Sequence, residues 1–178
     1  MLLVAFVIGG LAANPVAAHI QVRPTVAAPD DPVMFQVVVP NETEASTTSI
    51  QLKIPSGILP FSFEDTPGWK REVSYASNGS IDSVEWIGRL ARDGLVRFTF
   101  LASTPSKPGP IEWKAIQKYS DGEEAAWIGA PGSESPAAVT EIRADAPREN
   151  AGGEGESAQP GRQSESAETP TLTYVALV

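Results

Sequence analysis

The chain of 178 residues contains one histidine, His19, whose position can give it two metal-binding nitrogens at once. Residues 1–18 are typical of a secretion signal, because an apolar run is followed by an Asn-Pro helix breaker and by small residues at Val16 and Ala18. Cleavage after Ala18 makes His19 the first residue of the mature chain. Its α-amine and its imidazole then belong to one residue and can close a chelate ring on a metal ion.

The same N-terminal segment admits a second interpretation, an uncleaved membrane anchor. Its apolar run has about 12 residues, whereas a helix needs roughly 20 to span a bilayer. No Lys or Arg precedes Arg23, so the basic region that usually opens a signal peptide is missing. We expect cleavage, and therefore an extracytoplasmic protein, either periplasmic or at the cell surface.

The metal ion that such a terminus favours is Cu(II). Nitrogen and carboxylate oxygen ligands hold first-row divalent ions, and Cu(II) binds them most tightly. The chain has no cysteine, and Met34 is the one methionine outside the signal, so we expect no soft site for Cu(I), zinc or iron–sulfur chemistry. Two nitrogens from His19 leave one or two positions of a planar Cu(II) site for oxygen ligands.

A carboxylate near the N-terminal strand could supply that oxygen. Glu42 follows a predicted strand and could turn back toward His19. Glu44, Asp30 and Asp31 are rivals on spacing alone. A glutamate at the end of a strand is most often simply solvated, so the choice among the four stays open at this point.

The elements that must position these residues are predicted to be strands. Runs of alternating or β-branched residues are separated by Gly, Pro, Asn and Asp, a pattern typical of an antiparallel sandwich or barrel. The Asp121-Gly122 pair between two apolar runs predicts a hairpin. The expected strands are residues 20–22, 33–39, 49–54, 69–75, 83–87, 95–102, 111–118, 125–128 and 138–142.

Composition divides the chain into four parts: a signal peptide (1–18), a β-sandwich domain (19–144), a disordered linker (145–170) and an apolar terminus (171–178). The linker is rich in Glu, Gly, Ser and Pro and cannot bury enough apolar area to order itself. The last segment is either a short apolar end or the start of a truncated transmembrane helix that tethers the protein. The net charge of −9 argues against nucleic-acid binding.

Six sequence blocks, in order, resemble the YcnI-like copper-binding domain family. Residues 19–24 (HIQVRP) are similar to the family's H-V-x-V-x-P opening, and residues 113–122 (WKAIQKYSDG), closed by 127–129 (WIG), form the most specific block. The remaining blocks are residues 35–42 (FQVVVPNE), 47–57 (TTSIQLKIPSG), 67–69 (PGW) and 84–88 (VEWIG).

This resemblance implies an immunoglobulin-like antiparallel β-sandwich that binds Cu(II) through a brace built on one N-terminal histidine. It implies that His19 gives its amine and imidazole nitrogens, that Glu42 gives a carboxylate, and that Trp127 lies beside the metal. Trp127 could also simply pack in the core, which is the role expected of Trp69, Trp86 and Trp113. The resemblance also implies a bacterial protein that is secreted or tethered to the membrane.

The leading hypothesis is an extracytoplasmic Cu(II)-binding protein of copper homeostasis, which sequesters copper or passes it to a copper-transport or copper-chaperone partner. A copper oxygenase built on an N-terminal histidine needs a second histidine, and this chain has none beyond His19. No acidic pair accompanies an activated nucleophile either, so we expect no enzyme. The alternative is a metal-independent interaction module displayed at the cell surface on an acidic stalk.

Overall fold

The computed structural model describes residues 19–148, which form twelve β-strands and no helix. The all-β class predicted from the sequence is therefore confirmed. No helix long and apolar enough to cross a membrane occurs within this range. The strands are β1 (Gln21–Arg23), β2 (Val26–Ala27), β3 (Pro32–Asn41), β4 (Thr47–Lys53), β5 (Leu59–Phe63), β6 (Lys70–Tyr75), β7 (Ile81–Leu90), β8 (Gly94–Ser103), β9 (Gly109–Trp113), β10 (Ala115–Tyr119), β11 (Glu124–Trp127) and β12 (Ala138–Ile142).

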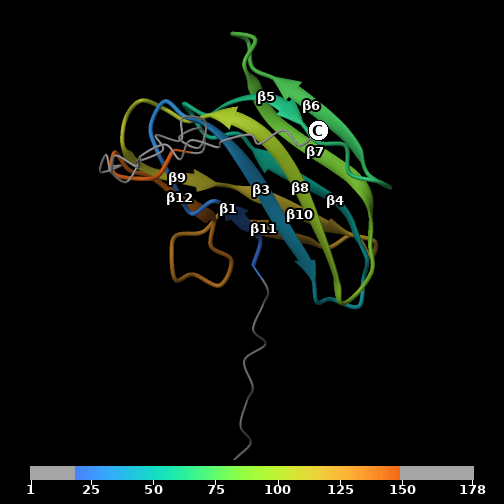
Figure 1. The fold of residues 1–178 in the computed structure, drawn as a ribbon. Helices are drawn as coiled ribbons and strands as arrows, with labels where there is room; N and C mark the ends of the chain where they lie inside the picture. The colour runs from blue at the N-terminus through green and yellow to red at the C-terminus, as the bar shows by residue number, and fades with distance from the viewer. Residues whose placement is uncertain (1–18, 149–178) are drawn as a thin grey trace, which may run out of the picture.

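Two antiparallel sheets face each other and form a sandwich (Figure 1). One sheet has the strand order β1-β3-β8-β5, and the other has the order β11-β10-β4-β7-β6. A smaller sheet, β2-β12-β9, lies at one end, with β2 parallel and β9 antiparallel to β12. This topology places β1, the first strand after His19, at a sheet edge beside β3.

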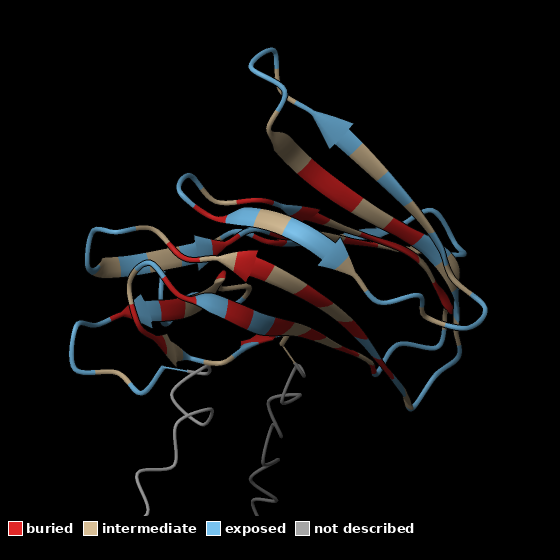
Figure 2. Cartoon of the chain, turned by 45° about the horizontal axis from the view of Figure 1, so that its top comes forward, coloured by how far each residue is buried: buried red, intermediate tan, exposed pale blue. Residues whose placement is uncertain are grey.

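Buried and outward-facing side chains alternate along the central strands, which explains why the two sheets pack against each other. Phe35, Val37 and Val39 of β3 are fully buried, while the residues between them face outward. Phe35 lies opposite Phe100 of β8 in the register, and Val37 lies opposite Phe98. Successive side chains leave a strand on opposite faces, so each strand contributes one apolar face to the core. Figure 2 shows buried residues alternating with exposed or intermediate ones along the strands, while most of the loops are exposed.

Aromatic rings bridge the two sheets at the centre of the core. Phe98 of β8 stacks on Trp86 of β7, with ring centroids 4.5 Å apart and an interplanar angle of 12°. Trp69 meets the same phenylalanine edge-on at 5.1 Å but is only half-buried. Trp113 is buried against Phe35 at 5.0 Å. Trp86 and Trp113 thus have the predicted core role in full, and Trp69 packs at the margin of the core.

The expected strand at 111–118 is wrong, because the chain changes sheets at Lys114. β9 pairs with β12, whereas β10 pairs with β4 and β11. Trp113 and Ala115 are both buried on either side of the exposed Lys114, so the alternating pattern continues unbroken while the hydrogen-bonding partners change. Side-chain alternation reports which face is buried and does not identify the neighbouring strand.

Two strands were missed because their sequences do not alternate. β5 is an edge strand with a register shift between Pro60 and Ser62, and most of its residues are exposed or half-buried. A bulge of this kind breaks the period of two on which strand prediction rests. β2 has only two residues. The hairpin predicted at Asp121-Gly122 is confirmed between β10 and β11, where Gly122 has a φ of +91°.

Several predicted segments lie outside the described residues. These are the signal peptide (1–18), the linker (145–170) beyond residue 148, and the apolar terminus (171–178). At the end of the described range, Arg148 Nη1 donates a hydrogen bond to the Pro29 carbonyl oxygen at 3.1 Å. The predicted domain boundaries therefore stay predictions.

The aromatic bridge between the sheets should dominate the stability of the domain. We expect Phe98→Ala to lower the free energy of unfolding by about 3–5 kcal/mol, because it leaves a cavity under Trp86 and Trp69. Leu95→Ala on the same strand removes a half-exposed side chain and should cost no more than about 0.5 kcal/mol. Urea denaturation measures both. Equal losses in the two variants would contradict this description of the core.

Candidate metal centre

His19 is held close to the sandwich by the strand that follows it. Ile20 is buried at 3% exposure, and Gln21 begins β1, where it lies opposite Val38 of β3. Continuing this antiparallel register by two residues puts His19 opposite Pro40, near the end of β3. The single histidine of the chain is therefore half-buried beside an ordered sheet edge.

The loop between β11 and β12 lies against the imidazole of His19. His19 Nε2 is 3.3 Å from the carbonyl oxygen of Glu134. The loop is closed by Gly129 N–H donating to the Ser135 carbonyl at 2.9 Å, and a Cβ on Gly129 would lie 2.2 Å from Ser133 Oγ. Figure 1 shows this loop, in orange, beside the blue segment that leads into β1. The sequence analysis missed it, because no residue pattern links positions 115 residues apart.

Trp127, the last residue of β11, contacts His19 directly. The two ring centroids are 5.4 Å apart and the planes cross at 74°, an edge-to-face arrangement. The indole is buried at 6% exposure and belongs to the hydrophobic core cluster. Trp127 therefore packs in the core and also contacts the ring of His19, while its place beside a metal stays a prediction.

A buried glutamine, Gln117, forms a hydrogen bond with the indole nitrogen of Trp127. Trp127 Nε1–H donates to Gln117 Oε1 at 3.3 Å. The amide nitrogen of Gln117 donates in turn to Thr47 Oγ1 at 2.8 Å and to the Pro40 carbonyl at 3.1 Å. The sequence analysis did not single out this residue. The available signal was a polar side chain on the inward face of a strand, two residues after the buried Ala115.

Glu42 is exposed and follows Asn41, the last residue of β3. The buried Asn41 side chain shapes the turn that carries it. Asn41 Nδ2 donates to the carbonyl oxygens of Ala45 and Leu90, at 2.9 and 3.1 Å. Its Oδ1 accepts hydrogen bonds from Thr43 N–H and Thr43 Oγ1. Glu42 thus lies two residues beyond Pro40, on a turn that Asn41 fixes.

The rival carboxylates lie at different distances along the chain from Pro40, the residue opposite His19. Glu44 forms an ion pair with Arg92. Asp31 precedes Pro40 by nine residues along an extended strand, a separation of about 30 Å at roughly 3.3 Å per residue. Asp30 lies in the same distant turn, with a φ of +50°. Asp30 and Asp31 therefore lie at the far end of β3 from Pro40, whereas Glu42 and Glu44 follow its near end.

Among residues 19–148, no three His, Cys, Asp or Glu side chains cluster in a way that could hold a metal ion. A brace would not produce such a cluster, because one residue supplies two of its ligands.

Tyr119, two residues after Gln117, adds no anionic ligand near neutral pH. Burial, with the negative charge of Asp121 as a smaller cause, raises the pKa of its phenol.

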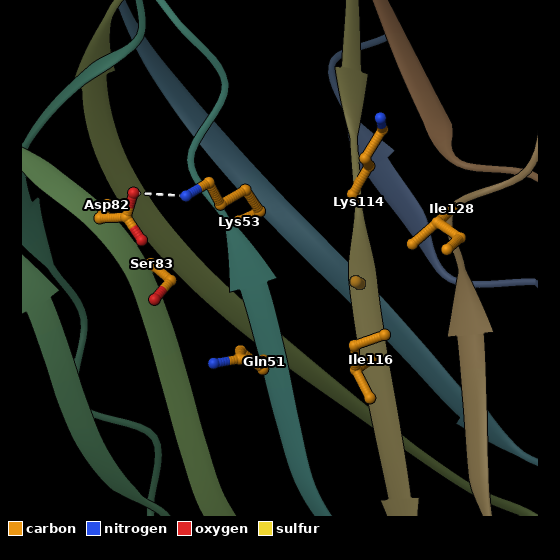
Figure 3. A pocket seen from close by; sticks show the side chains of 8 residues that line it. Gln51, Lys53, Asp82, Ser83, Lys114, Ile116 and Ile128 are labelled. Atoms are coloured by element: carbon orange, nitrogen blue, oxygen red, sulfur yellow. Dashed lines mark hydrogen bonds and ion pairs between the residues drawn. The ribbon is translucent and has the colours of Figure 1, made fainter. Parts of the chain in front are cut away.

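A separate shallow depression of about 360 Å³ lies on the outer face of the five-stranded sheet (Figure 3). Lys53 and Asp82 form an ion pair at one side of it, so their charges largely compensate. Ile116 points into it, whereas Gln117, the next residue, points to the opposite face of the sheet. The depression is therefore separated from the His19 centre by the sheet itself. It is lined by Gln51, Lys53, Asp82, Ser83, Lys114, Ala115, Ile116 and Ile128.

Comparison with known proteins places this sandwich in a family. Residues 19–148 match the family described as a domain of unknown function, DUF1775, and the chain belongs to that family. The chain is also 31% identical, over 131 residues, to the copper-binding protein CutI of Bacillus subtilis strain 168. That alignment covers 72% of this chain and 64% of CutI, so the chain spans less than two thirds of its relative's length.

A solved structure supports the fold assignment. An uncharacterised protein from Nocardia farcinica, described as having an immunoglobulin-like fold, matches with a TM-score of 0.60 at 26% identity. The match covers 70% of this chain and 97% of that chain. The predicted immunoglobulin-like sandwich and the predicted resemblance to the YcnI-like copper-binding family are both confirmed.

The turn that carries Glu42 should depend on the side chain of Asn41. We expect Asn41→Ala to lower the free energy of unfolding by about 1–3 kcal/mol, because two carbonyl oxygens lose their donor. Thr43→Val removes only the exposed hydroxyl of the same turn and should cost less than about 1 kcal/mol. Both are measured by urea denaturation. The description of the turn is wrong if the threonine variant loses as much stability as the asparagine variant.

Proposed function

We propose that this domain is an extracytoplasmic Cu(II)-binding protein of copper homeostasis, active once His19 is the first residue of the chain. The observation that carries the proposal is the contact between the single histidine and Trp127, near the end of β3 that Glu42 follows. Similarity to a relative named for copper binding supports the choice of metal. While Ala18 is attached, the nitrogen of His19 is an amide, so binding requires the cleavage predicted from the sequence.

The ligand set of the proposed centre begins with the two nitrogens of His19. The α-amine and Nδ1 of one histidine close a six-membered chelate ring, which Nε2 cannot do because it lies on the far side of the imidazole. A carbonyl oxygen only accepts hydrogen bonds, so the Glu134 contact requires the ring proton on Nε2. This tautomer leaves the lone pair of Nδ1 available for the metal. A hydrogen bond to the second ring nitrogen is the usual way that proteins orient a ligating histidine.

The surroundings of His19 suit Cu(II) better than Cu(I). The carboxylate of Glu42 would add a hard oxygen ligand and a negative charge. Met34 precedes Pro40 by six residues on β3, about 20 Å at roughly 3.3 Å per residue, so no thioether of the described residues reaches the centre. The Trp127 indole lies against one side of the imidazole in an edge-to-face contact.

The same features favour copper handling over catalysis. A centre with one protein imidazole, open to solvent on one side, suits uptake and release to a copper-transport or copper-chaperone partner. The chain holds no second histidine for an oxygenase of the N-terminal-histidine type. A C-terminal membrane tether, as predicted for residues 171–178, would keep the domain at the cell surface.

Calorimetric titration of the cleaved domain with Cu(II) tests the proposal. We expect His19→Ala to weaken binding by more than about 100-fold, because it removes a ligand of the metal. Loss of a group that only hydrogen-bonds to a ligand typically weakens binding by about 10–100-fold. One extra residue ahead of His19 should have a similar effect, because it turns the amine into an amide. Gln21→Ala on the same strand is the control and should bind as the parent does.

Two results would contradict the proposal. Unchanged affinity in the His19→Ala variant would mean that copper binds elsewhere or nonspecifically. No binding by the cleaved parent domain would favour the alternative, a metal-independent interaction module.

Copper binding should weaken in acid, because protons compete with the metal for both nitrogens of His19. We expect affinity to be highest at mildly alkaline pH, to fall as the pH is lowered, and to fall steeply below about pH 6. Titrations between pH 8 and pH 5 in a buffer that does not bind copper measure this dependence. An affinity that stays constant across the range would show that nitrogen ligation is not what holds the ion.

A further inference from the structure

We infer that Gln117 is a positioning residue of the metal centre: its side-chain amide holds the Trp127 indole against His19 and joins that indole to the end of β3 that Glu42 follows. This inference rests on the proposed function. Gln117 touches neither the imidazole nor a ligand, so any effect that it has on the metal must act through Trp127 or through β3.

The partners of Gln117 allow only one orientation of its amide. The oxygen faces a donor, Trp127 Nε1–H, and the nitrogen faces an acceptor, the Pro40 carbonyl. If the amide were turned over, its nitrogen would meet the indole N–H and its oxygen would meet the carbonyl oxygen. Neither pair could form a hydrogen bond. Thr47 Oγ1 accepts the second amide hydrogen at 2.8 Å.

This amide is buried, so its hydrogen bonds are obligatory. Gln117 is 1% exposed, and no buried side-chain nitrogen or oxygen of the described residues lacks a partner. A buried amide without hydrogen bonds costs more than an apolar residue of the same size. Glutamate cannot donate to the Pro40 carbonyl, and methionine can neither donate nor accept strongly. Glutamine accepts a hydrogen bond from the Trp127 indole and donates to both the Pro40 carbonyl and Thr47 Oγ1.

The hydrogen bonds of Gln117 connect the two sides of the space that His19 occupies. On one side, the bond to Nε1 fixes the rotation of the Trp127 indole, on which the edge-to-face contact at 5.4 Å depends. On the other side, the bond to Pro40 holds the strand end two residues before Glu42. One buried amide group therefore links the indole beside His19 to the strand end that Glu42 follows.

The structure contains a matched control, the pair Trp113 and Thr140. Trp113 Nε1–H donates to Thr140 Oγ1 at 3.0 Å, and both residues are buried. The ring of Trp113 contacts Phe35 and Phe100 rather than His19. Thr140→Val thus removes the acceptor of a second buried indole that takes no part in the proposed centre.

The first experiment uses the cleaved, metal-free domain and follows hydrogen exchange of the indole N–H groups by NMR. We expect Gln117→Met to speed exchange at Trp127 by about tenfold, the size expected for one lost hydrogen bond, and to leave Trp113 unchanged. Thr140→Val should speed exchange at Trp113 and leave exchange at Trp127 unchanged. If Gln117→Met does not fold, Thr47→Val replaces it and should speed exchange at Trp127 by a smaller factor. Unchanged exchange at Trp127 would overturn the inference.

The second experiment is a double-mutant cycle on Cu(II) affinity. Gln117→Met should weaken binding by about tenfold, within the range for partners that orient a metal site. In a Trp127→Phe background the same substitution should cause a smaller loss of affinity, since the route through the indole is gone and only the hydrogen bond to Pro40 on β3 remains. An equal loss in both backgrounds would overturn the inference, as would an equal loss in Thr140→Val.

The two experiments separate this inference from the proposed function. If His19→Ala binds copper as tightly as the parent, the proposed function fails, although indole exchange still reports whether Gln117 holds Trp127. If His19→Ala abolishes binding while Gln117→Met leaves both affinity and indole exchange unchanged, the proposed function stands and the role of Gln117 is wrong.

Discussion

The pairing of β1 with β3 is the constraint on which the proposed centre depends. Only Ile20 separates His19 from β1, and this isoleucine is buried. The ladder between Gln21 and Val38 therefore holds the imidazole near the end of β3. N-terminal residues are ordinarily poorly ordered unless a strand ties them down. Here the strand does so, and a ligand residue ordered in advance loses less entropy when it binds a metal.

The buried side chain of Trp127 links His19 to the rest of the sandwich. Trp127 belongs to the hydrophobic core and also forms a wall beside His19, so the position of that wall follows from the packing of the sheets. The sheets in turn depend on aromatic contacts such as that between Phe98 and Trp86. A substitution in the core can therefore alter the proposed metal centre without touching any of its proposed ligands.

The sequence alone predicted the parts that obey a local rule. Strands such as β3 and β8 alternate between apolar and exposed residues. The cleavage before His19 stays a prediction, because residues 1–18 lie outside the described residues. The sequence did not predict the change of sheet at Lys114, because side-chain alternation continues through it. It also missed the contact of His19 with Glu134, which depends on how distant segments fold together. Gln117 was overlooked because its role is set by its hydrogen bonds and not by its neighbours in sequence.

The central claim is that one residue supplies two nitrogens to Cu(II). Because His19 is the single histidine, growth with ¹⁵N-histidine labels its amine and its imidazole and no other histidine nitrogen. Electron paramagnetic resonance of the cleaved, copper-loaded domain then reports both nitrogens through their superhyperfine couplings. If His19 forms the brace, the label changes the couplings of two nitrogens. A spectrum that is the same with and without the label would contradict this claim.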